Sequence, residues 1–248
     1  MRIYSIYLII LGIFICSTIS CKKENMLDCV KSTGKTVKKI RSIDSFTAID
    51  LDDRINLYIS YSTELKLEVE AGENLQKLIK TKVENGVLKI RNENRCNWVR
   101  SYKRDINVYL STPELNEITY YGSGELRFTN MLKTDWFILN MWEASGNIDI
   151  RLDCPNVELK SHTGPADLQC GGFTNRLVAY TNGLGRMDLS NLIAKDVLAI
   201  NVNSGSLKVR SDSLLKATIE GSGDIFYRGN PTIEFNDLGS GELIPSGN

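Results

Sequence analysis

A glycine recurs seven times, at nearly regular intervals, through the second half of the chain. These glycines are Gly124, Gly146, Gly164, Gly185, Gly205, Gly223 and Gly241. Ser or Thr precedes six of them, an apolar residue stands two positions after all seven, and an apolar or aromatic residue stands four positions after six. Such a period indicates stacked repeats, in which each unit buries its apolar side only against its neighbours.

The residues around each glycine indicate a corner followed by a strand. Glycine tolerates the positive φ that a sharp corner often demands, and a hydroxyl can bond the backbone of the corner. Residues two and four positions later point to the same side of a strand, so both are expected to be buried. The pattern predicts an all-β fold, a single-domain right-handed parallel β-helix or β-solenoid with about 18–22 residues per turn. A propeller blade would need about 40 residues, and a sandwich would not explain a glycine column.

The strand pattern begins well before the first of these glycines. Alternating apolar and polar residues predict half-buried strands at 46–51, 55–59 and 65–69. A short helical turn is expected within 73–83. Gly86 has apolar residues two and four positions later, so the repeat is expected to extend back to it, with a further strand at 106–110. We therefore expect one solenoid domain over residues 43–248.

The N-terminus has a different character. One cation, Arg2, precedes an apolar run over residues 3–16, which is shorter than the roughly 20 residues of a membrane span and fits a secretory signal peptide. Residues 17–21 resemble the lipobox of bacterial lipoproteins, although Thr18 stands where Leu is favoured. This resemblance implies a signal peptide over residues 1–20 and a lipid on Cys21 that anchors the chain to a membrane. An ordinary cleavage site and an uncleaved anchor are the alternatives.

Residues 21–42 are expected to form a flexible tether. They carry seven cations and two acidic residues, so this segment either lies against anionic headgroups or is simply solvated. The chain as a whole has 30 basic and 30 acidic residues, which excludes the domain-wide basic footprint of a nucleic-acid-binding protein. These features predict an exported lipoprotein anchored in the outer membrane, facing the periplasm or the cell surface.

Four cysteines lie beyond Cys16 and Cys21, and the sequence leaves three pairings of them open. An exported protein sits where disulfides persist, and Cys154 and Cys170 are the candidate pair because they lie less than one repeat apart. The chain has one histidine and no Cys-x-x-Cys pair, so neither a zinc site nor another cofactor is expected.

Three parts of the chain together resemble a known family. They are Phe46–Ile49, Val108–Leu115 and the Gly-Ser-Gly phrases at 122–124, 221–223 and 239–241. This ordered set resembles the putative auto-transporter adhesin head-GIN domain family, common among lipoproteins of Bacteroidetes, over roughly residues 44–245. The resemblance implies a β-helical solenoid in the cell envelope, and it supplies no catalytic residues.

The position three after each glycine is expected to face solvent. In this register Asp149, Asp167 and Asp188 would stack on adjacent turns, with Arg127 below and Lys208 above. A calcium ion could relieve the repulsion among the three carboxylates, and so could water or the two flanking cations. The three aspartates are therefore a candidate cation site.

Residues 91–104 interrupt the repeat with five cations and two aromatic residues. Long loops on a rigid solenoid often carry function. The candidate ligand-binding residues are Arg95, Trp98, Arg100, Tyr102, Lys103 and Arg104. The aromatic rings could stack on sugars while the arginines hold acidic groups. The alternative is a solvated loop that is pinned by Cys96 and buries Trp98.

The sequence favours a non-catalytic function. His162, the only histidine, has no Ser, Cys or Asp at a spacing that makes a triad, so we expect a tolerated corner residue. We expect an envelope lipoprotein that serves as a structural or adhesion module and binds a glycan or protein through its flat strand face or the 91–104 loop. A polysaccharide-acting β-helix enzyme and a periplasmic partner of an envelope signalling system are the alternatives. Unpaired edges at the solenoid ends also make an end-to-end homodimer a candidate assembly.

Overall fold

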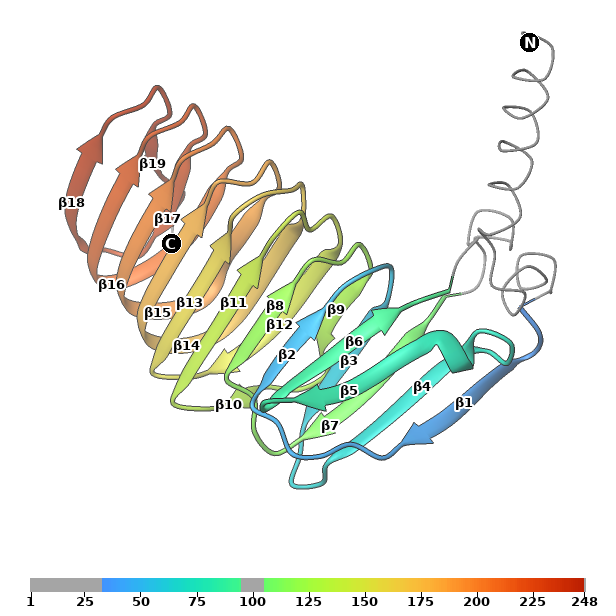
Figure 1. Ribbon diagram of the computed structural model, residues 1–248. Helices are drawn as coiled ribbons and strands as arrows, with labels where there is room; N and C mark the ends of the chain where they lie inside the picture. The colour runs from blue at the N-terminus through green and yellow to red at the C-terminus, as the bar shows by residue number, and fades with distance from the viewer. Residues whose placement is uncertain (1–32, 95–104, 248) are drawn as a thin grey trace, which may run out of the picture.

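The computed structural model describes residues 33–94 and 105–247. It is nearly all β, with 61% strand and 1% helix, and its strands stack as a β-solenoid of about six turns in one domain (Figure 1). The solenoid predicted from the glycine repeat is confirmed. In the parts of the chain that the structure describes, no helix has the length and apolar character needed to cross a membrane.

Short strands build the first part of the solenoid, and three long strands dominate the second. The short ones are β1 (Thr36–Arg41), β2 (Ala48–Leu51), β3 (Asn56–Tyr61), β4 (Lys66–Gly72), β5 (Ile79–Glu84), β6 (Val87–Asn92), β7 (Asn107–Thr112), β8 (Glu117–Tyr120), β9 (Glu125–Phe128), β10 (Leu132–Lys133), β11 (Trp136–Met141), β12 (Asn147–Asp153) and β13 (Asn156–Ser161). Then come β14 (Asp167–Thr181), β15 (Met187–Asn201), β16 (Leu207–Ile219), β17 (Ile225–Arg228), β18 (Thr232–Asp237) and β19 (Leu243–Pro245). One 3-10 turn, η1 (Gln76–Leu78), lies in the segment where the sequence predicts a helical turn.

The stacked strands form two parallel faces. Face A runs through β6, β2, β8, β11 and β13, then the second halves of β14, β15 and β16, and ends at β18. Face B runs through β7, β3, β9 and β12, then the first halves of the same long strands, and ends at β17 and β19. The long strands therefore bend around one edge of the solenoid and belong to both faces.

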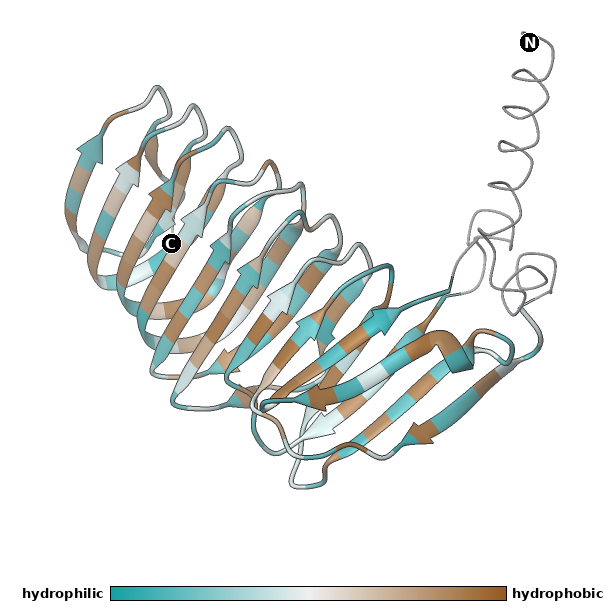
Figure 2. Ribbon diagram, in the orientation of Figure 1, coloured by the Kyte–Doolittle hydropathy of each residue, from teal (hydrophilic) through white to brown (hydrophobic). Residues whose placement is uncertain are grey.

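Hydrophobic and hydrophilic residues alternate along many of the strands (Figure 2). The buried apolar side chains fill the space between the faces. The residues two and four after most of the anchoring glycines are buried, as the repeat predicts, and the residue between them is half-buried or exposed. This alternation weakens only in the last two turns, where Tyr227 and Leu243 are half-buried. The core is one continuous cluster rather than separate domain cores.

The glycines form two neighbouring columns rather than the single column that the spacing suggests. A Cβ on Gly185 would overlap the carbonyl of Ala166, whereas a Cβ on Gly164 would overlap Ala144. Ala166 therefore takes the place of a glycine in the first column, and Gly164 belongs to the second. The first column is Gly124, Gly146, Ala166, Gly185, Gly205, Gly223 and Gly241. The second includes Gly122, Ala144, Gly164, Gly183, Asn203, Gly221 and Gly239.

Close approach, rather than positive φ, explains why most of these positions are glycine. Among the seven anchoring glycines only Gly164 has a positive φ, of 96°. At Gly146 a Cβ would overlap both the Gly124 carbonyl oxygen and the Tyr120 hydroxyl. Where a glycine stands in these columns, the corners of successive turns thus pack backbone against backbone and leave no room for a Cβ.

The N-terminal turns do not stack in chain order. β2 lies between β6 and β8, and β3 lies between β7 and β9. Gly86 lies beside Thr47, because its carbonyl accepts bonds from the amides of Thr47 and Ala48. The residues two and four after Gly86, Leu88 and Ile90, are buried as the repeat predicts, but Gly86 itself is not a member of the glycine columns. In the turn built by β2 and β3, the equivalent of Gly124 is the buried Ile55.

Antiparallel strands close the N-terminal end. β5 pairs with β6, β4 pairs with β7, and β1 pairs with β4. The buried Gln76 amide of η1 donates to the carbonyls of Val37 and Val69, and Arg41 donates to the Gln76 carbonyl. The predicted tether therefore ends too late, because residues 36–41 form β1 and belong to the folded domain.

Cys154 and Cys170 are both buried and both free, so the predicted disulfide is wrong. Cys170 pairs with Ile150, four residues before Cys154, and the neighbouring pair Asp153 and Phe173 fixes the register. Four residues along a strand span about 13 Å, beyond the Cα separation that a disulfide can bridge.

Candidate functional site

Face B carries rows of paired charges. At the level of the predicted cation site, Arg127, Asp149, Gln169, Asp188 and Lys208 follow one another on successive turns. The carboxylate of Asp149 lies 3.9 Å from Arg127, and that of Asp188 lies 3.4 Å from Lys208. Gln169 separates the two aspartates, so like charges do not stack.

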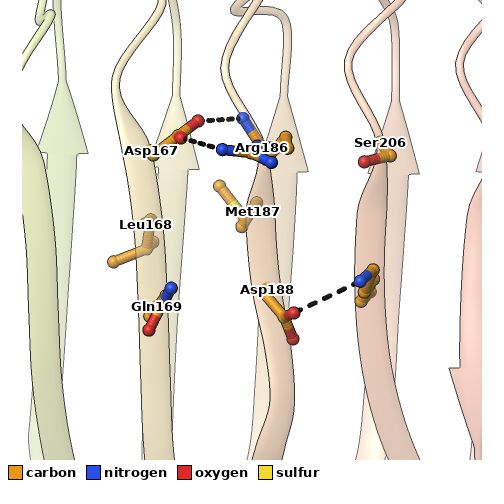
Figure 3. Close-up of a pocket in the computed structure, with 8 residues that line it drawn as sticks. Asp167, Leu168, Gln169, Arg186, Met187, Asp188 and Ser206 are labelled. Carbon is orange, nitrogen blue, oxygen red and sulfur yellow. Dashed lines mark hydrogen bonds and ion pairs between the residues drawn. The ribbon is translucent and has the colours of Figure 1, made fainter.

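Asp167 lies outside this row. It pairs in register with Asn147 and forms an ion pair of 2.7 Å with Arg186 (Figure 3). The expected stack of Asp149, Asp167 and Asp188 is therefore absent, because the register places Gln169, not Asp167, beside Asp149. Over the described residues, no group of three or more His, Cys, Asp or Glu side chains could hold a metal ion.

The hollow beside these residues has a volume of about 170 Å³ and is lined by both polar and apolar groups. Hydrogen bonds from Arg186 hold the pKa of Asp167 below its ordinary value. Burial raises the pKa of Asp188, but hydrogen bonds from Ser190 and the nearby Lys208 outweigh this effect, so the net pKa is lowered. The carboxylates here are already compensated, which favours a structural role for face B.

All of the candidate ligand-binding residues of the 91–104 loop fall outside the described residues. Arg95, Trp98, Arg100, Tyr102, Lys103 and Arg104 lie there, as does Cys21. Arg91, at the start of the insertion, is described and donates to the Asp50 carboxylate at 2.7 Å. This cation of the loop therefore holds β6 to β2.

Aromatic side chains gather on face A, at the corner where β8, β11 and β13 end. We call Tyr121, Trp142, His162 and Tyr180 the aromatic cluster. The rings of Trp142 and His162 stack with centroids 3.8 Å apart and planes 7° apart. The Tyr180 ring lies 5.7 Å from that of His162. Tyr121 precedes Trp142 by one turn, because Tyr120 pairs with Met141.

The cluster is rigid on one side and open on the other. His162 is half-buried, and its Nε2 lies 3.3 Å from the Asn140 amide oxygen. Trp142 remains 40% exposed and Tyr121 41% exposed. A single exposed aromatic residue is ordinary, but Tyr121 and Trp142 lie on adjacent turns beside the stacked His162, so together they form a patch that is a candidate binding surface.

The neighbouring surface of face A is apolar. The outward-facing side chains of β14 and β15 next to the cluster are Val178, Tyr180, Leu198 and Ile200, all half-buried. Face B at the same turns presents paired charges instead. At these turns the outward side chains named here on face A are apolar, whereas those of face B are charged and paired.

The apolar sequence of residues 136–142 predicts a core strand, and the structure confirms this for every second residue of β11. Phe137, Leu139 and Met141 are buried, whereas Trp136 and Trp142 are exposed. The signal was available, because Trp142 and His162 stand one turn of the repeat apart. His162 is thus a stacked member of the cluster rather than merely a tolerated corner residue.

His162 makes the stability of the fold depend on pH. Burial and the nearby Lys160 lower its pKa below 6.5 in the folded protein. The unfolded chain then binds more protons, so the stabilisation is complete above about pH 6.5 and is lost as the pH falls further. We expect the free energy of unfolding to drop between about pH 7.5 and about pH 5.5, and His162→Gln to flatten this drop. Urea unfolding of the wild type and of His162→Gln at the two pH values tests this. An equal fall in the free energy of unfolding for the two proteins would contradict it.

Known proteins were compared with the chain as a whole. Among curated proteins none matches. The crystal structure of a "putative adhesin" from Bacteroides fragilis is 25% identical, has a TM-score of 0.80, and the match covers 87% of this chain and 99% of that one. A "putative lipid binding protein" from Parabacteroides distasonis is 21% identical with a TM-score of 0.68, covering 86% and 100%. A "putative adhesin" from Parabacteroides merdae is 20% identical with a TM-score of 0.63, covering 85% and 97%.

The last two similarities support the fold alone, and the family assignment comes from the sequence. A family model described as "Putative auto-transporter adhesin, head GIN domain" matches residues 45–231, which is most of the chain. The match includes the aromatic cluster and both glycine columns up to residue 231. This chain therefore belongs to the auto-transporter adhesin head-GIN domain family.

Proposed function

We propose that this protein is a non-catalytic adhesion module of the cell envelope, and that it binds a glycan through the aromatic cluster on face A. The observation that carries the proposal is the exposed Trp142, stacked on His162 and held on a rigid β-scaffold. A large aromatic ring that is already ordered gives contact area at little cost in conformational entropy.

The surroundings of the rings suit a sugar. Sugars present apolar C–H faces together with hydroxyl groups, so they need aromatic surface with polar groups beside it. Asn140 and Lys160 pair with one another on adjacent strands of face A, directly beside the rings. Asn140 already contacts His162 and Glu117, and Lys160 is paired with Glu158, so these polar groups are held in place.

The location is part of the same proposal. The family is named for adhesins, which act at the cell envelope. Export through residues 1–20 and a lipid on Cys21 would place the solenoid there, tethered by the residues that precede β1. Labelling of the chain with palmitate in growing cells, and its loss in Cys21→Ala, would support this anchor, whereas unchanged labelling would contradict it.

Trp136, the first residue of β11, and Trp142, which directly follows β11, provide a matched test of the glycan site. We expect Trp142→Ala to weaken glycan binding by more than about tenfold, because it removes the exposed ring of the cluster. Trp136→Ala is the control, because Trp136 is 45% exposed at the start of the same strand but lies outside the cluster. A glycan array of the full chain, followed by calorimetry with the best sugar, measures both. Equal effects of the two variants, or binding to lipid vesicles but to no glycan, would contradict the proposal.

A further inference from the structure

The two ends of the solenoid are finished differently. At the N-terminal end, antiparallel strands and η1 cover the core, and Leu75, Gln76 and Ile79 are buried there. At the C-terminal end the last strands, β18 and β19, each pair with a strand on one side only in the described structure. Figure 1 shows these strands at the tip of the stack, with no segment laid across them.

At the open end, side chains are exposed at positions whose equivalents on the preceding turn are buried in the core. Ile233 and Phe235 of β18 are 40% and 43% exposed. Their partners on the preceding turn, Leu215 and Ala217, are 0% and 1% exposed. Leu238, just after β18, is 63% exposed. An unpaired strand edge with apolar side chains is a template for pairing with another chain.

The charge at this end selects among partners. Residues 220–247 carry five acidic side chains and one basic one, Arg228. The acidic residues are Glu220, Asp224, Glu234, Asp237 and Glu242. Glu234 is neutralised by Lys216 at 2.7 Å, which still leaves the end strongly acidic. Two such ends facing one another would bring like charges together, which disfavours a two-fold dimer through this surface.

The N-terminal end of the same molecule has the complementary character. β1 carries Lys38, Lys39 and Arg41 and no acidic residue. Its Ile40 is 69% exposed. β1 pairs with β4 alone among the described strands, so its outer edge is also unpaired. A basic edge with an exposed apolar residue lies at one end of the chain, and an acidic apolar edge lies at the other.

We propose that the C-terminal end of one copy binds the N-terminal end of a second copy, so that the solenoids associate head to tail. The contact covers Phe235 and Leu238 and sets the acidic end against β1. Because this interface joins two different surfaces, a pair formed through it keeps one unused end of each kind, so further copies can add in a row. It is separate from the aromatic cluster, and each can fail without the other.

Exposed residues allow each end to be blocked without disturbing the core. The N-end variant is Lys39→Glu with Ile40→Glu, and the C-end variant is Asn236→Lys with Leu238→Lys; all four positions are exposed. Lys195→Glu, an exposed charge reversal away from both ends, is the control. Sedimentation of the full chain, in a non-ionic detergent at one chain per micelle, measures association across concentration and salt.

We expect the wild type and the control to form species that lengthen with concentration and shorten at high salt. Either end variant alone should associate roughly tenfold more weakly or worse, since it loses an apolar anchor and gains charge of the sign that its partner end already carries. Mixing the two variants should give a one-to-one pair that does not lengthen further, because each supplies the one intact end that the other lacks. A monomeric wild type at all concentrations would overturn the proposal. So would an N-end variant that still dimerises, which would indicate pairing of two C-terminal ends.

Discussion

Replacing Gly146 with alanine should destabilise the solenoid severely. A Cβ at this position would overlap the Gly124 carbonyl oxygen and the Tyr120 hydroxyl, and Tyr120 is fully buried. Tyr120 also donates to the Gly124 carbonyl at 2.7 Å, so relieving the overlap would break a buried hydrogen bond. We expect a loss of about 4 kcal/mol or more, a large part of the roughly 5–15 kcal/mol that holds a typical domain together.

Gly171→Ala is the matched control for this substitution. The nearest atom to a Cβ at Gly171 lies 3.5 Å away, an ordinary contact, and its φ is not positive. We expect its free energy of unfolding to stay within about 0.5 kcal/mol of the wild type. Urea titration followed by circular dichroism measures both variants. Similar stabilities for Gly146→Ala and Gly171→Ala would show that the corners have room, contrary to the packing described above.

Replacing Phe137 with alanine should lower the free energy of unfolding by a comparable amount, because it removes a core side chain of face A. Phe137 is fully buried in β11, and its ring meets that of Phe128 edge to face with centroids 5.8 Å apart. Phe128 belongs to face B and Phe137 to face A, so this contact joins the two faces. Phe137→Ala removes the transfer energy of the ring and leaves a cavity, at a cost of about 3–5 kcal/mol.

Phe173→Ala is the control, because Phe173 is 54% exposed on the outside of β14. Its free energy of unfolding should change by less than about 0.5 kcal/mol. Thermal unfolding of the two variants beside the wild type tests the contrast. A Phe137→Ala protein that unfolds at the wild-type temperature would mean that the two faces are not held together through this contact.

The architecture was predictable because the repeat is expressed in residue types that only a stacked turn requires. Glycine at a fixed corner, followed by two apolar residues with one between them, appears on successive turns. The register within the stack was less predictable, because the turns differ in length. Ala166 stands where a glycine would have marked the first column, so the spacing alone places Gly164 in the wrong one.

That shift explains the error at the candidate cation site. Side chains alternate between the two sides of a strand, so a shift by two positions keeps the predicted inward and outward residues but changes their neighbours. Asp167 still faces outward, yet it meets Arg186 rather than another aspartate. Burial is thus easier to predict from this sequence than lateral pairing.

The N-terminal end shows a second kind of limit. β1 resembles a polar tether because three of its six residues are cations, and charged edge strands resemble linkers in composition. Its antiparallel pairing with β4, which comes much later in the chain, leaves no local signal. The position of β2 and β3 between later strands also has no signal in the sequence. Nothing in the residues of β6 indicates that this strand pairs with β2.

The aromatic cluster was missed because its members come from separate turns. Trp142, His162 and Tyr180 lie on three successive turns, and only the register of the stack brings them together. In the sequence Trp142 ends an apolar run and resembles a core residue. In the structure Met141 faces inward, so the neighbouring Trp142 faces outward.

Hydrogen–deuterium exchange with and without a bound glycan would test the central claim most directly. The claim is that face A, at the aromatic cluster, is the binding surface of a rigid solenoid. Ligand should slow exchange at the ends of β8, β11 and β13, in the corners around Tyr121, Trp142 and His162, and leave face B unchanged. Protection confined to residues 91–104, or to the charged rows of face B, would contradict it.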